Sequence, residues 1–125
     1  MENKSNIDLA KAWIALQYVK KGASAYDANF WAFTMLDELR DKDLERHWNV
    51  INEIKNLDDS DFMLSNLAAG PVEDLLVTSG KAFINRIEAS ARDDERFRAM
   101  LGMVWKNDIP EEVWARVERA AGRKS

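Results

Sequence analysis

The sequence predicts an all-α protein arranged as a short stack of antiparallel helix pairs, of the α-solenoid or HEAT-like kind. The main support is an internal repeat, because residues 50–62 and 83–97 share the pattern x-Ile-Asn-x-Ile followed by Asp-Asp-x-x-Phe. The offset is 33 residues in the first part of the pattern and 35 in the second, and a period near 34 is typical of a helix-turn-helix unit. Only two Pro and five Gly, without sustained apolar-polar alternation, favour helices over strands.

A unit of this kind cannot bury its apolar face alone, so neighbouring units must stack. We expect seven or eight short helices in a single domain, residues 1–125, with a disordered tail at 122–125. A compact orthogonal bundle is the alternative arrangement of the same helices.

The first helix is predicted over residues 7–21, where apolar residues such as Trp13 recur at helical spacing. Asn6 is the expected N-cap. Gly22 is the expected stop, because glycine tolerates the left-handed conformation that often ends a helix.

The second helix is expected to begin at Ser24 or Asp27 and to end near Arg40. Its apolar stripe is wide and predicts burial on more than one side of the helix. The stripe contains Phe30, Trp31, Phe33, Leu36 and Leu39.

The third helix is expected to follow Asp41 as its N-cap. The acidic run at residues 58–61 opens a fourth helix, which places Phe62 on an apolar face. Gly70 and Pro71 are predicted to stop that helix, because glycine supplies a left-handed C-cap and proline presets the first turn of the next helix.

The following helix is predicted to reach about Arg92, with a kink or break at residues 79–80. Asp93 or Asp94 then opens a helix that continues to Trp105. Pro110 and the two glutamates after it open the last helix.

The segment 67–76 reads Leu-Ala-Ala-Gly-Pro-Val-Glu-Asp-Leu-Leu, and a distinctive series of apolar positions follows it. The series includes Gly80, Phe83, Ile84, Phe97, Leu101, Trp105 and Trp114. Over about residues 44–118 the chain resembles an uncharacterised bacterial family of short helical proteins of unknown function. The resemblance implies an all-α fold and a bacterial or phage source, and it carries no activity to transfer.

Composition argues against several classes of chemistry. The chain has no Cys, so it can form neither a disulfide nor a thiolate metal site. It has one His, and no pattern in the sequence supports a Ser-His-Asp triad. It also has no Gly-rich phosphate loop. We therefore expect no cofactor and no metal, and we do not favour an enzyme. With no apolar run near 18 residues and no signal-peptide pattern, we expect a cytoplasmic protein without a membrane partner.

The net charge of −4 is unevenly distributed. Residues 41–75 carry three basic and nine acidic side chains, whereas residues 76–125 carry ten basic and eight acidic ones. An acidic middle favours a basic protein partner. The C-terminal arginines are interleaved with acids, which argues against nucleic-acid binding.

Our first functional hypothesis is a non-catalytic protein-interaction module, of an inhibitor, immunity or adaptor type, that uses an acidic helical surface. Aromatic residues beside the apolar stripes are candidate anchors, and the acidic run supplies candidate charges. These interface candidates are Trp31, Asp58, Asp59, Asp61 and Trp105.

Two other hypotheses stay open. His47, Arg86 and Glu88 are candidates for a small-ligand or enzymatic site, provided that they converge. For Glu88, the simplest interpretation is an ion pair with Arg92, four residues on, or neutralisation by Arg86 or another basic group. The third hypothesis is a homodimer formed through the apolar N-terminal helix pair, which carries Trp13, Phe30 and Trp31.

Overall fold

The computed structural model describes residues 4–123, which form α-helices joined by short turns and contain no β-strand. The all-α prediction is confirmed. The chain divides into two compact units, an N-terminal unit, Met1–Met63, and a C-terminal unit, Leu64–Ser125. The stacking of helix pairs across the whole chain stays a prediction.

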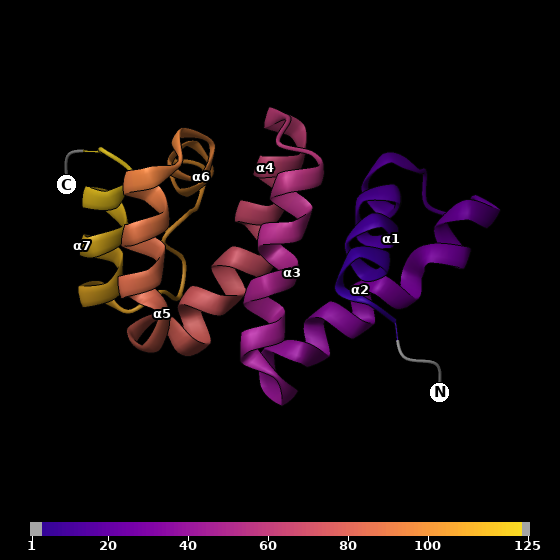
Figure 1. The fold of residues 1–125 in the computed structure, drawn as a ribbon, viewed down its shortest axis with the longest axis horizontal. Coiled ribbons are helices and arrows are strands. Elements are labelled where there is room, and N and C mark those ends of the chain that lie inside the picture. The colour runs from indigo at the N-terminus through magenta and orange to yellow at the C-terminus, as the bar shows by residue number, and fades with distance from the viewer. Residues whose placement is uncertain (1–3, 124–125) are drawn as a thin grey trace. The chain divides into compact units, whose positions relative to one another are not determined.

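The N-terminal unit contains three main helices, α1 (Asn6–Tyr18), α2 (Ser24–Lys42) and α3 (Leu44–Leu57), shown in Figure 1. Each of the three contacts the other two. Their apolar faces form one core, to which all three contribute, with Leu9, Trp13, Leu36, Ile51 and Ile54 among its buried members.

The helix ends in this unit differ from the prediction by a few residues. Ser5, rather than Asn6, caps α1, and its hydroxyl accepts from the backbone N–H of Asp8 at 3.0 Å. Asn6 is already helical, and its side-chain oxygen instead accepts from Nε of Arg46 at 2.7 Å. Helix α1 ends at Tyr18, and Gly22 has the expected positive φ of 88° in the turn that follows.

The N-cap of α3 is Asp43 and not Asp41. Its carboxylate accepts from the N–H of Arg46 at 3.1 Å. Helix α2 continues to Lys42, so Asp43 is the non-helical residue between the two helices and is the one placed to cap.

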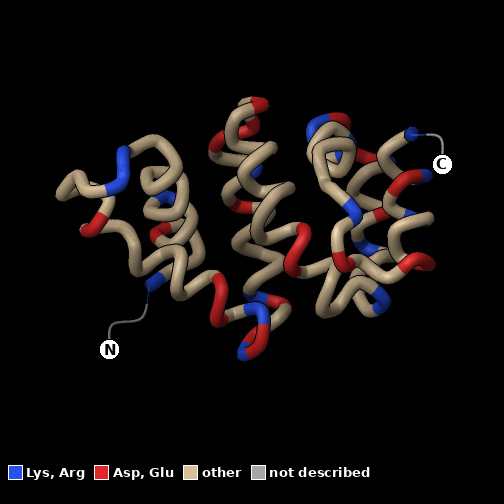
Figure 2. Tube along the Cα trace, turned by 180° about the vertical axis from the view of Figure 1, so that it is seen from behind, with Lys and Arg blue, Asp and Glu red and all other residues tan. Residues whose placement is uncertain are grey.

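Helix α2 is buried on one side only, which contradicts the prediction of burial on several sides. Ala32, Leu36 and Leu39 face the core. Phe30 and Phe33 lie on the other side and are 42% and 50% exposed. Residues 28–36 carry no charged side chain, so the trace of α2 is tan along this stretch in Figure 2.

The second half of the chain is also helical. Helix α4 (Asp61–Leu67) contains the boundary between the units, and the π-helical turn η1 (Ala68–Val72) follows it directly. The C-terminal unit then contains α5 (Glu73–Asp93), α6 (Glu95–Leu101) and α7 (Glu111–Ala120). Helix α5 contacts η1, α6 and α7, and α6 contacts α7.

The expected stop at Gly70 and Pro71 is wrong. The chain stays helical there and passes through the wide π-turn into α5. A proline inside a helix lacks an N–H and crowds the carbonyl four residues earlier. One π-turn at this point accommodates that misfit without ending the helix.

The predicted kink at residues 79–80 is confirmed. Ser79 has non-helical angles, φ −140° and ψ 23°, inside α5. Just before it, the Thr78 hydroxyl donates to the carbonyl oxygen of Asp74 at 2.9 Å, a contact that often accompanies helix bending. A Cβ on Gly80 would lie 2.8 Å from Cγ1 of Val113, so the missing side chain lets α5 and α7 approach closely.

Asp94 caps α6 and accepts from the N–H groups of Arg96 and Phe97 at 2.9 and 3.2 Å. Helix α6 ends at Leu101 and does not reach Trp105 as predicted. The predicted tail also differs in part, because Arg123 donates to the carbonyl oxygens of Leu101 and Val104. Residues 124–125 of that tail lie outside the described residues.

The predicted number of helices and the single domain stay predictions. The run from residue 61 to 93 counts as one, two or three helices according to whether it is divided at η1 and at Ser79.

Candidate functional site

Glu88 lies on α5 and is ion-paired with Arg116 of α7. Arg116 donates to both carboxylate oxygens, from Nε at 2.8 Å and from a terminal nitrogen at 2.5 Å. The same guanidinium donates to the side-chain oxygen of Asn85 at 2.7 Å. The ion-pair partner of Glu88 is therefore neither Arg92 nor Arg86, the two residues that the sequence suggested by name.

The bidentate hydrogen bonds from Arg116 lower the pKa of the Glu88 carboxyl, against the opposing effect of desolvation. The charges of Arg116, Arg92 and Arg119 act in the same direction as those hydrogen bonds. The contact also raises the pKa of the Arg116 guanidinium. Glu88 is thus held ionised near neutral pH, and the pair joins α5 to α7.

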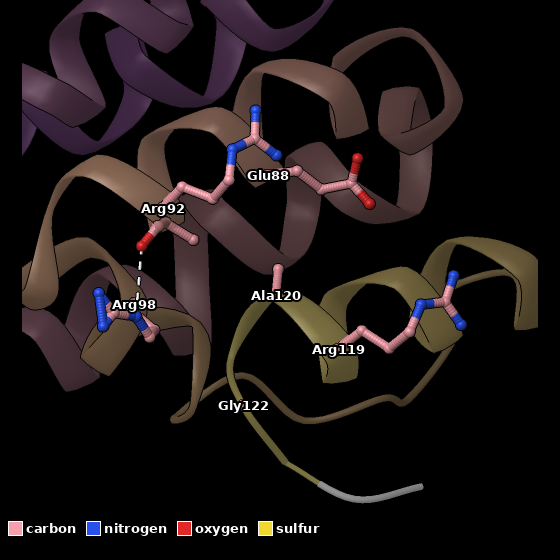
Figure 3. Close-up of a pocket in the computed structure, with 7 residues that line it drawn as sticks. Glu88, Arg92, Arg98, Arg119, Ala120 and Gly122 are labelled. Carbon is pink, nitrogen blue, oxygen red and sulfur yellow. Dashed lines mark hydrogen bonds between the residues drawn. The ribbon is translucent and has the colours of Figure 1, made fainter.

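A pocket of about 530 Å³ opens beside this pair, within the C-terminal unit (Figure 3). We call it the arginine pocket. Arg98 is held on its wall by a hydrogen bond of 3.3 Å from Nε to the carbonyl oxygen of Ala91. Figure 3 shows the three arginines spread around the pocket. The lining residues are Glu88, Ala91, Arg92, Arg98, Arg119, Ala120 and Gly122.

Arg86 does not join this site. Its guanidinium carbon lies 4.8 Å from the centre of the Phe83 ring, a cation–π contact on another part of α5. The structure therefore brings Glu88 together with Arg92, Arg98 and Arg119, whereas the sequence had proposed Arg86 and His47. Arg92 and Arg119 lie close to expected helix ends, which is a clue that could have drawn attention to them. Arg98 gave no such clue, because its helix was expected to continue to Trp105 and ends instead at Leu101.

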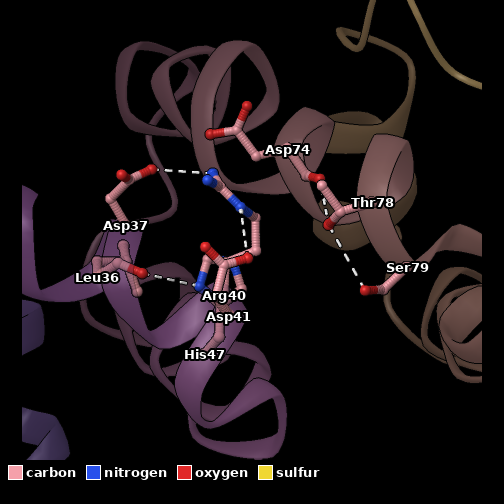
Figure 4. Close-up of polar contacts among 8 residues, drawn as sticks. All are labelled: Leu36, Asp37, Arg40, Asp41, His47, Asp74, Thr78 and Ser79. Carbon is pink, nitrogen blue, oxygen red and sulfur yellow. Dashed lines mark hydrogen bonds and ion pairs between the residues drawn. The ribbon is translucent and has the colours of Figure 1, made fainter.

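His47 lies in the N-terminal unit, on α3, and is 1% exposed. Its Nδ1 is 3.0 Å from the carbonyl oxygen of Leu36, as Figure 4 shows. Because a carbonyl oxygen can only accept, Nδ1 carries the proton of this hydrogen bond. The bond joins α3 to α2. The same view shows the ion pair of 2.9 Å between Arg40 and Asp37 on α2. His47 belongs to the N-terminal unit and Glu88 to the C-terminal unit. A shared site formed by these two residues therefore stays a prediction.

The acidic run lies beside exposed aromatic side chains in the N-terminal unit. The rings of Tyr18 and Phe62 are 5.1 Å apart and are 57% and 48% exposed. Asp59 and Asp61, which precede Phe62 within the same short segment, are exposed. We call this surface the acidic aromatic patch, and it consists of Tyr18, Asp58, Asp59, Asp61 and Phe62.

Asp58 has a structural role within that patch. The Tyr18 hydroxyl donates to its carboxylate at 2.5 Å, and the Ser60 N–H donates to it at 3.1 Å. The hydrogen bond from Tyr18, followed by those from Ser60, lowers the pKa of the Asp58 carboxyl. Asp58 thereby ties the end of α3 to the end of α1, and Asp59 and Asp61 are the exposed acids of the patch.

A second apolar surface runs along α2. Ring centres are 5.8 Å apart for Tyr26 and Phe30, and 5.4 Å apart for Phe30 and Phe33. Their spacing of four and three residues puts all three on one helix face. We call this row the α2 aromatic stripe. Sequence periodicity grouped Phe30 and Phe33 correctly but assigned their face to the core.

The two tryptophan candidates lie in different settings. Trp31 is half-buried, with Nζ of Lys4 5.3 Å from the ring centre. Trp105 follows α6 and is 75% exposed. Of the two, Trp105 offers the larger free surface to a partner.

Residues 4–123, the part of the chain that the structure describes, contain no group of three or more His, Cys, Asp or Glu side chains placed to hold a metal ion. Among the same residues, every helix is too short or too polar to cross a lipid bilayer.

A family model matches residues 19–125, and its description is a family of unknown function, DUF6869. The match confirms the expected relationship to an uncharacterised family and extends beyond residues 44–118 in both directions. No curated protein and no solved structure matches the chain.

Proposed function

The chain belongs to this family of unknown function, and we propose that it is a non-catalytic protein-interaction module of the inhibitor, immunity or adaptor type. Its N-terminal unit binds a basic segment of a protein partner through the acidic aromatic patch. The lack of cysteine fits action in a reducing cytoplasm, and the family resemblance described above implies a bacterial cell.

The observation that carries this proposal is the pairing of exposed aromatic rings with exposed acids. Tyr18 and Phe62 present large apolar surfaces that the unit itself leaves uncovered. Rigid aromatic side chains of this kind are frequent anchors of protein interfaces. Asp59 and Asp61 are exposed and lie within three residues of Phe62 in sequence, where they contribute negative charge.

Charge complementarity selects the kind of partner. Residues 1–63 carry eight basic and twelve acidic side chains, for a net charge of −4, while residues 64–125 carry ten of each. The whole net charge of the chain therefore belongs to the N-terminal unit. A basic partner is attracted to this unit and an acidic one is repelled.

The test is capture of a partner from source-cell lysate by the full chain and by a variant with Asp59→Lys, Asp61→Lys and Phe62→Ser. Asp58 is left intact because it holds α1 to α3. We expect one stoichiometric partner, rich in Lys or Arg at its contact site, that the variant fails to capture and that added salt releases.

The matched control reverses two acids of the C-terminal unit, Glu95→Lys and Asp108→Lys. Glu95 is in the first turn of α6, as Asp61 is in the first turn of α4, and Asp108, like Asp59, is an exposed residue in a connection between helices. The control should retain the partner. Equal capture by both variants, or equal loss from both, contradicts the proposed surface.

The α2 aromatic stripe supports self-association as a second candidate function. In a twofold dimer each surface meets its own copy, so a charged stripe would repel itself. Residues 28–36 have no charge, and Phe30 and Phe33 are exposed. Sedimentation velocity should show a dimer that Phe30→Ser and Phe33→Ser convert to a monomer. A monomeric wild-type chain at high concentration removes this candidate.

A further inference from the structure

The arginine pocket lies where the C-terminal ends of three helices come together. Arg92 is in the last turn of α5, Arg98 in the last turn of α6 and Arg119 in the last turn of α7. All three side chains line the same pocket, and its lining residues belong to neither of the surfaces proposed above for protein binding.

The positive charge of this pocket is only partly balanced. The carboxylate of Glu88 is already paired with Arg116 through both oxygens. Within described residues 4–123, Arg92 and Arg119 make no side-chain hydrogen bond or ion pair. Each helix C-terminus contributes roughly −0.5 charge, so three helix ends offset about 1.5 of the three positive charges. An excess of about 1.5 positive charges is left in the pocket.

In a second pocket of the same unit, each positive charge is neutralised by an ion pair. Its volume is about 240 Å³, and its two cations are Lys81 and Arg116. Lys81 is paired with Glu112 at 2.8 Å, and Arg116 is paired with Glu88. The charge excess is therefore a property of the arginine pocket and not of the C-terminal unit as a whole.

We propose that the arginine pocket binds a small organic molecule that carries one phosphate monoester. Such a group carries roughly 1.5 to 2 negative charges at pH 7, which matches the excess. Guanidinium groups bind phosphate oxygens through paired hydrogen bonds. The volume of about 530 Å³ exceeds what a bare phosphate fills and lies in the range of small-molecule sites. Ala91 and Ala120 supply apolar wall for the organic part.

Arginine in a last helical turn also stabilises its helix without any ligand, because it faces the negative end of the helix dipole. The two roles make different predictions. A purely helix-stabilising arginine affects the melting temperature of the free chain and gives no saturable response to phosphate. A ligand-binding arginine shows a response that its replacement removes.

The experiment is a titration of the full-length chain with ribose 5-phosphate, inorganic phosphate and citrate, followed by NMR of the arginine Nε–H signals. We expect saturable shifts at Arg92, Arg98 and Arg119, with ribose 5-phosphate binding more tightly than inorganic phosphate or citrate. Arg92→Gln and Arg119→Gln should each weaken ribose 5-phosphate binding about tenfold, since each removes a charge-assisted contact.

The control is Lys81→Gln, which removes a cation of the same unit outside the pocket. It should leave the affinity for ribose 5-phosphate unchanged. Three results overturn the proposal: shifts that do not saturate, equal weakening by Lys81→Gln and Arg92→Gln, or citrate binding as tight as ribose 5-phosphate. These variants leave the acidic aromatic patch intact, so failure here is distinguishable from failure of the protein-binding function.

Discussion

The two copies of the repeated pattern begin alike and end differently. In each, the Ile-Asn-x-Ile part forms the last turns of a helix, and its apolar residues are buried. The closing phenylalanine differs, because Phe62 is 48% exposed while Phe97 is 1% exposed. The buried residues of the first part are Val50, Ile51 and Ile54 in one copy and Phe83, Ile84 and Ile87 in the other.

A shift of one residue in the helix cap accounts for the difference. In the second copy Asp94 is the N-cap, and Phe97 is the third residue of α6. In the first copy the hydroxyl of Ser60 accepts from the N–H of Met63 at 3.2 Å, so Ser60 occupies the cap position. Phe62 is then the second residue of α4.

Adjacent helical positions point about 100° apart, so this shift turns the phenylalanine from the core to solvent. Met63 takes the buried third position in its place and is fully buried. In the second copy, Glu95 stands at the position of Ser60. Glutamate is a poorer N-cap than serine, so the cap does not shift to this position. The position of the capping residue thus decides whether the phenylalanine of the motif is buried or exposed.

The largest expected contrast comes from truncating the two phenylalanines. Phe97→Ala should lower the free energy of unfolding by about 3 to 5 kcal/mol, because it leaves a cavity in the core. Phe62→Ala should cost about 1 kcal/mol or less, the scale of one exposed aromatic pair. Urea denaturation followed by circular dichroism measures both. Equal losses would mean that the two copies do not differ as described.

Gly80→Ala tests how tightly the C-terminal unit is packed, in contrast to the uncovered surfaces of the N-terminal unit. Its Cβ would come within 2.8 Å of Val113, so we expect a loss of about 1 to 3 kcal/mol from overpacking. Gly70→Ala is the control, because no atom outside its chain neighbours and its own helical turn lies within 4 Å of its added Cβ. It should be neutral or slightly stabilising. A neutral Gly80→Ala variant would show that the α5–α7 contact is loose.

Replacing the two caps sharpens the comparison further. Asp94→Ala should cost about 1 to 2 kcal/mol, since Asp94 caps two N–H groups with a charged acceptor. Ser60→Ala should cost about 0.5 to 1 kcal/mol, because it removes one neutral hydrogen bond. Thermal unfolding of the two variants shows which substitution causes the larger loss of stability. The reverse order would argue against Asp94 as the stronger cap.

The smallest effect concerns pH. Glu88 has a pKa lowered by Arg116, so its contribution is present above the ordinary glutamate pKa and is lost as the pH falls through the lowered value. The pair is partly exposed, with Arg116 37% accessible, so we expect under about 1 kcal/mol. Glu88→Gln should flatten the loss of stability that begins as the pH falls through the ordinary glutamate pKa of about 4.3. An unchanged pH profile contradicts the assignment.

The sequence predicted the helix content, the kink and a helix start at Asp93 or Asp94, because each depends on neighbours within a few residues; the structure shows that Asp94 is the cap. It missed Asp43 as the cap of α3, because two aspartates precede that helix and only the length of α2 decides between them. It also missed the continuation through Pro71, since a π-turn has no local pattern to mark it.

The candidate sites were less predictable, because they depend on contacts between residues that are far apart in the sequence. Glu88 was identified, but its partner Arg116 is 28 residues away, and pairing over that distance depends on how α5 meets α7. Periodicity placed Phe30 and Phe33 on one face of α2. It could not tell whether another helix covers that face, and in the N-terminal unit none does.

The division between Met63 and Leu64 has a kinetic consequence. Helices α1, α2 and α3 find their partners within the first unit, and α5, α6 and α7 find theirs within the second. Chains whose contacts are local in sequence close only short loops and fold in about microseconds to milliseconds. During synthesis, the N-terminal unit has the partners of its three helices once residue 63 has left the ribosome, before the arginine pocket exists.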